Sequence, residues 1–493
     1  MAIGIWLAVC VEPGMASVTV YGGPTYNAAT HTGYIATGPE YDARVISRSV
    51  GIGSAGRFVN STLAIDERAF RIDTDGFNEL AHLPVGTLFS RASDVNESGT
   101  IVGWSSSFSS PALSQRPVRW DANGTLATEL ETLRFPSGIF APASAVAINT
   151  AGTIVGVTTI AAPGRSGYHA ARWDAGGTAI TELEALGEHS SGAYAVAQAI
   201  NDAGPIVGFA SRFQDDVAGG TRAARWDANS IVPVELDGIG TDNDGVGQSE
   251  ARDINEHGEV AGFAKKYING VGRGNRAIRW DAGGTAPTEL ETLGFRSDGY
   301  GYALADRINA SGTRIGFSER IVDGVAKGSR AVRWDAGSVV ATELGNLGTD
   351  ANGETSSDAT DINDEGITVG YARVQTTSTL VRHALMWLPG STTPIDLNSM
   401  IDPSSGWVLS FAHGISNTNW ITGKGKFDPD GVGPIAAYDR QFLLQVPEPA
   451  LPIVDIGLLT LRRRRQRDNG ALRPSTHRDA RRKRRAALVG PGR

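Results

Sequence analysis

Residues 200–208 read INDAGPIVG, and the phrase returns as INEHGEVAG at 254–262 and as INDEGITVG at 362–370. Further copies stand at 95–103, 148–156, 308–316 and 415–423, and a degraded copy, IGSAGRFVN, stands at 52–60. The last glycine of the phrase recurs every 52–54 residues, at Gly103, Gly156, Gly208, Gly262, Gly316, Gly370 and Gly423. A fixed period of this length is typical of propellers and solenoids rather than of separate domains.

Two more phrases follow the first one in every full repeat. The second is Arg-Ala-x-Arg-Trp-Asp, as in RAARWD at 222–227, and the third is Glu-Leu-x-x-Leu, as in ELETL at 289–293. We expect the recurring tryptophans to pack as core between repeats rather than to form a carbohydrate platform. They are Trp120, Trp173, Trp226, Trp280, Trp334 and Trp387.

Each repeat contains four short β-like segments. In residues 197–239 these segments are separated by Gly, Asn and Asp turns, and no window of the chain shows helical spacing of apolar residues. Tight turns such as INDAG suit hairpins in which glycine takes a positive φ. Four strands in about 53 residues predict an all-β chain folded as a β-propeller of four-stranded blades.

The number of blades follows from how the ends are assigned. The last repeat lacks its fourth strand, and a strand-like segment, ASVTVYG at 16–22, is unclaimed at the N-terminus. If residues 16–22 pair beside RQFLL at 440–444, the ring closes with eight blades and no exposed sheet edges. The alternative is seven blades, in which the degraded first repeat forms none. Either way the propeller spans residues 17–445.

An arginine and a glutamate lie ten residues apart across the turn that follows each tryptophan. A hairpin centred on that turn would place them opposite each other, which predicts cross-strand ion pairs worth about 0.2–1 kcal/mol where exposed. The pairs are Arg119/Glu129, Arg172/Glu182, Arg225/Glu235, Arg279/Glu289 and Arg333/Glu343.

Composition excludes several classes of protein. The chain has 493 residues, 62 glycines and 41% apolar residues, so it can bury a core. A single cysteine, Cys10, excludes a disulfide framework and a thiolate zinc site, and the eight histidines form no HExxH motif. The net charge of −8 combines an acidic body with a basic tail at 462–493. We therefore expect the body not to bind nucleic acid.

The C-terminal region contains a candidate sorting signal. A Pro-Glu-Pro signature precedes the apolar stretch ALPIVDIGLLTL at 450–461, and an arginine cluster follows it. These features resemble the PEP-CTERM sorting signal, although the apolar stretch is shorter than the roughly 20 residues of a membrane span. The resemblance implies handling by exosortase-type machinery at the inner membrane, with the arginines on the cytoplasmic side. The residues concerned are Val446, Pro447, Glu448, Pro449, Arg462, Arg463, Arg464 and Arg465.

The two ends give the predicted organisation of the chain. Residues 1–16 carry an apolar run and small residues, as in a secretory signal peptide, but no basic residue precedes the run. The propeller follows, then the sorting segment at 446–465. A basic, disordered tail at 466–493 completes the chain.

The phrase order also resembles the HAF family of extracellular repeats, whose copies contain an INxxGxxVG-like turn and a His-Ala-Phe-like strand. The His-Ala form is present at His169-Ala170 and His383-Ala384, and the other repeats have mostly Arg-Ala. The resemblance covers about 400 residues. It implies an exported repeat protein, often with a PEP-CTERM tail, and no established enzymatic activity.

No catalytic motif is present in the sequence, so we expect no enzyme and no cofactor. Three D-x-D-G turns offer oxygen ligands that would suit Ca²⁺, but they lack the other ligands of an EF-hand loop and are ordinary turn chemistry. The candidate metal residues are Asp73, Asp75, Asp242, Asp244, Asp428 and Asp430.

The sequence favours an exported, monomeric, non-enzymatic protein, tethered transiently to the inner membrane and displayed at or released from the cell surface. We expect it to bind a polysaccharide or a surface protein through variable loops such as 209–221, 240–250 and 263–275. Two alternatives remain: a carbohydrate-active enzyme, which needs paired carboxylates at the channel, and a cytosolic scaffold.

Overall fold

The computed structural model describes residues 62–446 with short gaps, together with five strand segments between residues 20 and 59. The gaps are 74–75, 84–88, 108–113, 134–140, 161–165, 188, 190–191, 376–379, 432 and 434–435. The predicted signal peptide, residues 1–16, lies outside the described residues. The sorting segment from 447 and the basic tail also lie outside them.

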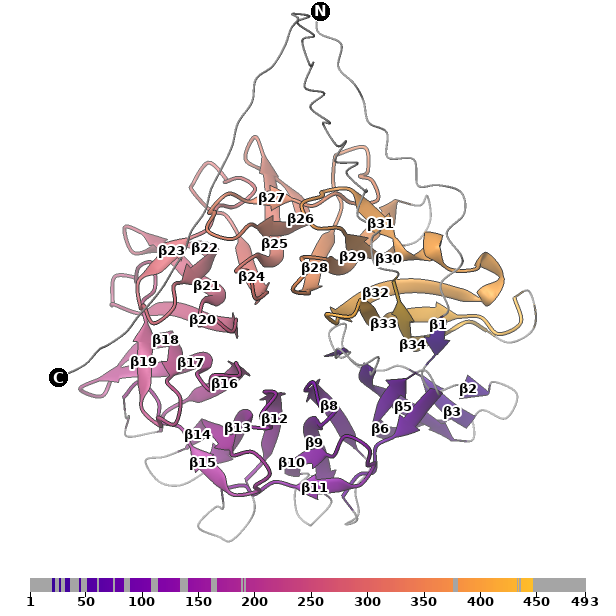
Figure 1. Cartoon of the computed structure of the whole chain (residues 1–493). Coiled ribbons are helices and arrows are strands. Elements are labelled where there is room, and N and C mark those ends of the chain that lie inside the picture. The colour runs from indigo at the N-terminus through magenta and orange to yellow at the C-terminus, as the bar shows by residue number, and fades with distance from the viewer. Residues whose placement is uncertain are drawn as a thin grey trace, which may run out of the picture. The chain divides into compact units, whose positions relative to one another are not determined.

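Antiparallel four-stranded sheets make up the central repeats, and in each sheet the strands follow one another in chain order (Figure 1). The first two are β8 (Ser90–Val95), β9 (Ile101–Ser107), β10 (Ser114–Trp120) and β11 (Ala127–Glu129), then β12 (Ala143–Ile148), β13 (Ile154–Ile160), β14 (Gly167–Trp173) and β15 (Ile180–Glu182). The next two are β16 (Ala195–Ile200), β17 (Ile206–Gln214), β18 (Val217–Trp226) and β19 (Pro233–Leu236), then β20 (Gly247–Ile254), β21 (Val260–Ile268), β22 (Val271–Trp280) and β23 (Pro287–Glu289). A short parallel bridge between β18 and β20 joins these two sets.

Two more sheets of the same kind follow. They are β24 (Ala303–Ile308), β25 (Arg314–Val322), β26 (Val325–Trp334) and β27 (Thr342–Glu343), then β28 (Ser357–Ile362), β29 (Thr368–Gln375), β30 (Leu380–Trp387) and β31 (Pro394–Asp396). The strand nearest the centre, from β8 to β32, contacts its counterpart in the next sheet. This is the strand arrangement of propeller blades, so the prediction of an all-β chain with four-stranded sheets is confirmed.

The remaining strands come from the two ends of the described chain. One sheet contains β2 (Tyr26–Asn27), β3 (Thr32–Ile35), β4 (Arg44–Val45), β5 (Gly51–Val59), β6 (Thr62–Asp73) and β7 (Gly76–Glu79). The other contains β32 (Trp407–Ile415), β33 (Trp420–Phe427), β34 (Tyr438–Gln445) and β1 (Val20–Gly22). In the second sheet β1 pairs antiparallel with β34, and Val20 stands opposite Leu444.

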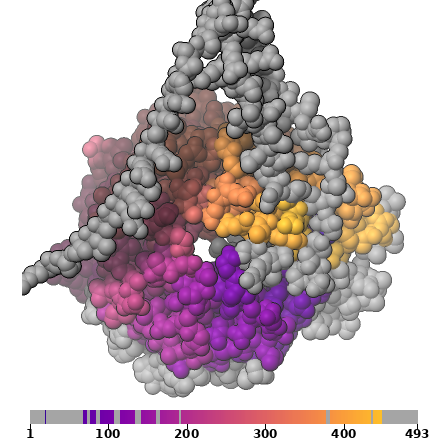
Figure 2. Space-filling view, in the orientation of Figure 1, coloured from indigo at the N-terminus to yellow at the C-terminus, as the bar shows by residue number. Residues whose placement is uncertain are grey.

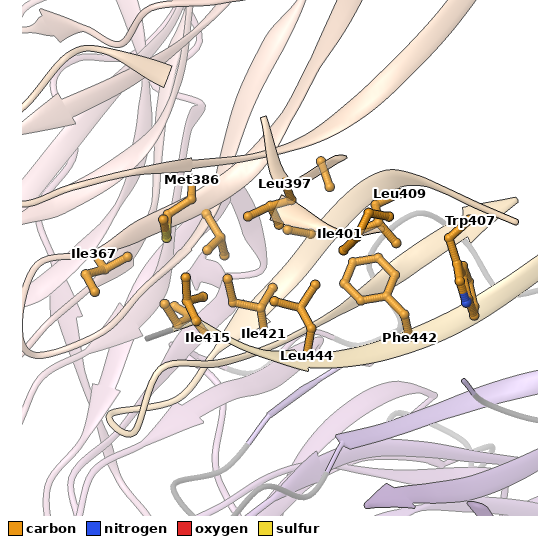
Figure 3. Close-up of a cluster of buried hydrophobic side chains, with 14 residues drawn as sticks. Ile367, Met386, Leu397, Ile401, Trp407, Leu409, Ile415, Ile421, Phe442 and Leu444 are labelled. Carbon is orange, nitrogen blue, oxygen red and sulfur yellow. The ribbon is translucent and has the colours of Figure 1, made fainter. Parts of the chain in front are cut away.

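The hydrophobic core lies between neighbouring sheets. Figure 3 shows one such layer, in which Ile367 and Met386 of the β28–β31 sheet meet Ile421 and Leu444 of the last sheet. A separate buried cluster joins Phe70 and Ile72 of β6 to residues of β33 and β34. Apolar side chains point from both faces of the central sheets, from β8 to β31, so each of these sheets packs against a neighbour on both sides.

Helices are almost absent from the described residues. The two that occur are short 3₁₀ turns, η1 (Leu397–Met400) and η2 (Pro403–Ser405), each with an aspartate side chain capping its first turn. In the part of the chain that the structure describes, no helix has the length and apolar character needed to cross a membrane.

Candidate functional site

The asparagine of the INxxG phrase links each blade to the next. Its Nδ2 donates to the backbone oxygen at the equivalent position of the following repeat, as Asn255 does to Asn309 at 3.2 Å. Its Oδ1 accepts from its own turn, as from the Glu259 backbone N–H at 2.9 Å. The same links start at Asn96, Asn149, Asn201, Asn309 and Asn363. The phrase therefore fixes both the turn and the contact between blades.

The six tryptophans form a second series of links, further from the centre. Each is fully buried, and each indole N–H donates to a backbone oxygen of the preceding repeat, as Trp280 does to Asp237 at 3.0 Å. The other five donate in the same way. A platform that stacks against sugars would need exposed rings, and these rings lie inside the core.

The arginine–glutamate pairing predicted from the ten-residue spacing is wrong by one register step. Thr128, not Glu129, stands opposite Arg119, and Glu129 stands opposite Val118. Glu129 therefore shares a sheet face with Arg116, and their side chains lie 3.0 Å apart. Arg119 points to the other face, where it pairs with Asp121 at 3.3 Å.

The corrected pairing explains the alternation of Arg-Ala with His-Ala. The acidic partners of His169 and His383 are Glu182 at 2.9 Å and Asp396 at 2.6 Å. In the other repeats the first arginine of the phrase fills the same slot, and the pairs are Arg222–Glu235, Arg276–Glu289 and Arg330–Glu343. Either side chain therefore contacts the acid on the outer strand, so the slot tolerates both.

The recurring glycine of the phrase meets a β-bulge in the innermost strand. A Cβ on Gly262 would lie 2.1 Å from the backbone oxygen of Glu250, far inside van der Waals contact. The equivalent contact is 1.9–2.3 Å at Gly103, Gly156, Gly208, Gly316, Gly370 and Gly423. The pairing register skips one residue of the innermost strand at this point. Glycine is therefore needed because the bulge brings two backbones together.

The bulge adds one unpaired residue to the strand and changes the direction of that residue's side chain. The bulged residue lies two positions before the Ile or Val of the phrase and differs in every repeat. These residues are Ser93, Val146, Gln198, Arg252, Asp306, Thr360 and His413.

Five of these bulged residues, Val146 to Thr360, line one cavity of about 430 Å³, which we call the bulge cavity. Leu304, Phe317, Arg307 and Asp358 complete most of its wall. In the space-filling view the described parts of the chain surround an opening at the centre (Figure 2).

Three consecutive bulged residues keep free polar groups. Gln198, Arg252 and Asp306 make no side-chain hydrogen bond to any residue in the described part of the chain. Arg252 has only long ion pairs, to Glu250 at 3.5 Å and to Asp306 at 4.0 Å, and its guanidinium lies over the Phe263 ring. Burial raises the pKa of the Asp306 carboxyl, which the arginines on either side partly oppose.

Arg307 is held differently. Burial opposes its charge, but Asp253, Asp361, Asp306 and Asp94 outweigh that cost and raise its pKa. Three of these aspartates also accept a backbone N–H from the following blade, as Asp253 does from Ile308 at 3.1 Å. Arg307 and its aspartates are therefore part of the framework around the centre.

A second, smaller cavity of about 270 Å³ lies at the other end of the innermost strands, among the INxxG turns. Two of its acidic side chains accept backbone N–H groups. Glu256 accepts from Asp202, and Asp364 accepts from Ala310. This end is occupied by contacts between blades.

The second and third strands of several sheets form long hairpins, which extend from the end of the sheet where the innermost strand begins. Residues 209–221 and 263–275, expected to be loops, are instead paired strands of β17–β18 and β21–β22. Their two-residue turns have positive φ at both positions, as at Asn269 and Gly270. The tips expose aliphatic side chains, and we call them the hairpin face: Val217, Ile268, Val271, Val322 and Val325.

The candidate calcium residues are separated in the fold. The Asp242 carboxylate accepts the backbone N–H groups of Asp244 and Val246, and the Asp428 carboxylate accepts those of Asp430 and Gly431. Among the described residues no group of three or more His, Cys, Asp or Glu could hold a metal ion. Asp75 and the sorting residues after Val446 lie outside the described residues, as does the side chain of Asp73.

Comparison of sequences identifies one family. The sequence profile of a family described as "Protein of unknown function (DUF3466)" matches residues 173–444. No curated protein matches the chain significantly.

Solved structures resemble the chain only distantly. The β-propeller domain of the Trilobed protease from Pyrococcus furiosus is 9% identical, with 73% of this chain and 97% of that chain covered and a TM-score of 0.42. An oligogalacturonate lyase in complex with manganese is 12% identical, with 88% and 99% covered and a TM-score of 0.38. A Mycobacterium tuberculosis puromycin-hydrolyzing peptidase is 13% identical, with 89% and 64% covered and a TM-score of 0.41. The activities in these names are those proteins' own.

Proposed function

This chain belongs to the DUF3466 family, and we propose that it is an exported, non-enzymatic binding protein of the bacterial cell surface or extracellular matrix. The observation that carries the proposal is the hairpin face. Three adjacent sheets each raise a hairpin with exposed aliphatic side chains at its tip, such as Val271 at 51% exposed. Apolar side chains grouped at one end of a protein are typical of a surface that contacts a macromolecule.

The ring itself serves this function as a rigid support. We propose eight blades, closed by β1 beside β34. Three contacts support closure: the pairing of Val20 with Leu444, the cluster that joins Phe70 to Leu443, and the contacts of β4 with both β32 and β8. A cysteine pair at positions 20 and 444 should cross-link under oxidation, whereas a pair at positions 20 and 438 should not.

Export and sorting rest on the ends of the chain. The signal-like residues 1–16 and the PEP-CTERM-like residues 446–465 support an exported protein that exosortase-type machinery processes. Cell fractionation tests this proposal. We expect the protein at the surface or in the medium, and deletion of residues 447–493 should change its distribution between the two. Protein confined to the cytosol would contradict export and favour the cytosolic scaffold.

Binding is tested with hairpin variants. The double variant Ile268→Asp/Val271→Asp should reduce binding to purified envelope or matrix fractions by at least tenfold, because two charges replace the exposed aliphatic tip. The matched control is Val340→Asp, which changes an equally exposed valine (54%) outside the hairpins. Equal binding by wild type and both variants would contradict a role for the hairpin face.

A glycan-cleaving activity is the second candidate, favoured by two acids beside the bulge cavity. Burial raises the pKa of Glu250 and of Asp306, and the charge of Asp306 adds to the effect at Glu250. Raised carboxyl pKa values suit a general acid. Product formation from a glycan panel, lost in Glu250→Gln and Asp306→Asn, would establish this activity in place of simple binding.

A further inference from the structure

We infer that the bulge cavity is a binding site for an uncharged sugar, separate from the hairpin face and independent of export. Side chains from consecutive blades line the cavity. They occupy equivalent positions of the repeat but differ in chemistry. Gln198, Arg252 and Asp306 occupy one position of the repeat, line one cavity and lack hydrogen-bond partners among the described residues. The Arg252 and Asp306 side chains are 33% and 26% exposed, so these polar groups are open to a ligand that enters the cavity.

The chemistry of these three groups is complementary to hydroxyl groups. Gln198 offers two donors and an acceptor, Arg252 offers only donors, and the Asp306 carboxylate offers acceptors. A molecule that satisfies all three must itself carry several donors and acceptors close together. Adjacent sugar hydroxyls do so, because each hydroxyl donates one hydrogen bond and accepts others.

The charges of the wall favour a ligand without charge. Two arginines, Arg252 and Arg307, and two aspartates, Asp306 and Asp358, line the cavity, so their formal charges cancel. An anion would meet the two aspartates, and a cation would meet the two arginines, so neither is favoured over a ligand without charge.

Part of the wall is apolar. Val146, Leu304 and Phe317 lie beside the polar triplet, and Phe317 stacks on Tyr302 with ring centroids 5.8 Å apart. Sugars present C–H faces as well as hydroxyls, and such faces pack on apolar and aromatic side chains. The volume of about 430 Å³ lies within the range of about 300–1,000 Å³ for small-molecule sites. A mono- or disaccharide is therefore the fitting class of ligand.

The test measures binding of neutral sugars to the full chain by saturation-transfer NMR and calorimetry. The probes are glucose, galactose, N-acetylglucosamine, cellobiose and maltose, with glucuronate and glucosamine as charged counterparts. We expect at least one neutral sugar to bind. We expect its charged counterpart to bind at least tenfold more weakly.

Variants locate the binding. Arg252→Met keeps an unbranched side chain beside Phe263 but removes all donors, and it should weaken sugar binding about tenfold or more. Gln198→Met should weaken it severalfold. Ser93→Ala is the matched control, because Ser93 is a bulged residue outside this cavity, and it should leave the affinity unchanged. Thermal melting of each variant shows whether the fold is retained.

The outcomes separate this inference from the proposed function. Sugar binding that is lost in Arg252→Met while matrix binding persists supports two sites. The inference is overturned if no neutral sugar binds, if charged sugars bind more tightly, or if Arg252→Met and Ser93→Ala bind alike. Matrix binding that depends on the hairpin variants would survive each of those results.

Discussion

The two ends of the innermost strands differ in whether the residue is the same in every repeat and in whether its polar groups form hydrogen bonds. At the INxxG end, the asparagine recurs from Asn96 to Asn363, and each one donates across to the next blade. At the bulge end, the residue changes in every repeat, and Gln198, Arg252 and Asp306 remain without hydrogen bonds among the described residues. Repetition therefore marks the contacts that hold blades together, and variation marks the surface left for a ligand.

The largest expected effect comes from His413, a buried bulged residue whose ring nitrogens have no hydrogen-bond partner in the described part of the chain. Burial, and then the nearby Lys424, lower its pKa from 6.5 to about 3. Below pH 6.5 the His413 side chain is protonated in the unfolded chain but stays neutral in the folded protein. The free energy of unfolding therefore falls as the pH falls. At pH 3.5 this single group should cost about 4 kcal/mol.

Urea unfolding of His413→Phe between pH 7 and 3.5 measures that cost. The phenyl ring should keep the stacking on Phe411, and the variant should lose much less stability in acid than wild type. The control is His257→Gln, at an exposed histidine, which should follow the wild-type curve. Parallel curves for wild type and His413→Phe would show that His413 does not titrate in this way.

The second effect concerns the glycine that faces the bulge. Gly262→Ala should destabilise the protein by about 3 kcal/mol, because its Cβ would overlap a backbone oxygen that cannot move without breaking the sheet. Gly238→Ala is the control, since the nearest atom to its Cβ is 3.8 Å away. Equal melting temperatures for the two variants would refute the link between glycine and bulge.

The third effect tests the asparagine links. Asn309→Ala removes the donor to Asn363 and the acceptor for the Thr313 backbone N–H, and should cost about 2 kcal/mol. Asn243→Ala, at an exposed asparagine, should cost less than about 0.5 kcal/mol. Chemical denaturation of both variants measures the difference, and similar values would mean that the links between blades add little.

The smallest effect is expected at the variable bulge residue itself. Gln198→Ala should change stability by less than about 0.5 kcal/mol, because it breaks no hydrogen bond among the described residues. Denaturation under the conditions used for Asn309→Ala allows direct comparison. A loss as large as that of Asn309→Ala would make the bulge residue structural and remove the contrast between the two ends.

Much of the architecture could be predicted from spacing alone. The period set by Gly103 to Gly423 gives the repeat, and turn phrases such as INEHG at 254–258 divide it into strands. The ion pairs could not be placed in this way. A one-residue shift in the β10–β11 hairpin moves Glu129 from the sheet face of Arg119 to that of Arg116, because successive side chains point to opposite faces.

The bulge cavity left only a faint signal in the sequence. Aligning the repeats on their Ile-Asn dipeptide shows that the position two residues before it never repeats, as with Gln198, Arg252 and Asp306. That variation does not say where the side chain points. A regular strand would alternate its side chains between two sheet faces, and only the bulge turns this one residue toward the cavity.

The sequence by itself determined the repeat, the four-stranded unit and the choice of residues for turns, because these depend on local backbone preferences and a fixed period. The tertiary structure decided which polar groups meet. Asn255 finds its partner 54 residues away, and Arg252 and Asp306 share a cavity, since only the stacking of sheets side by side brings equivalent positions of successive repeats together.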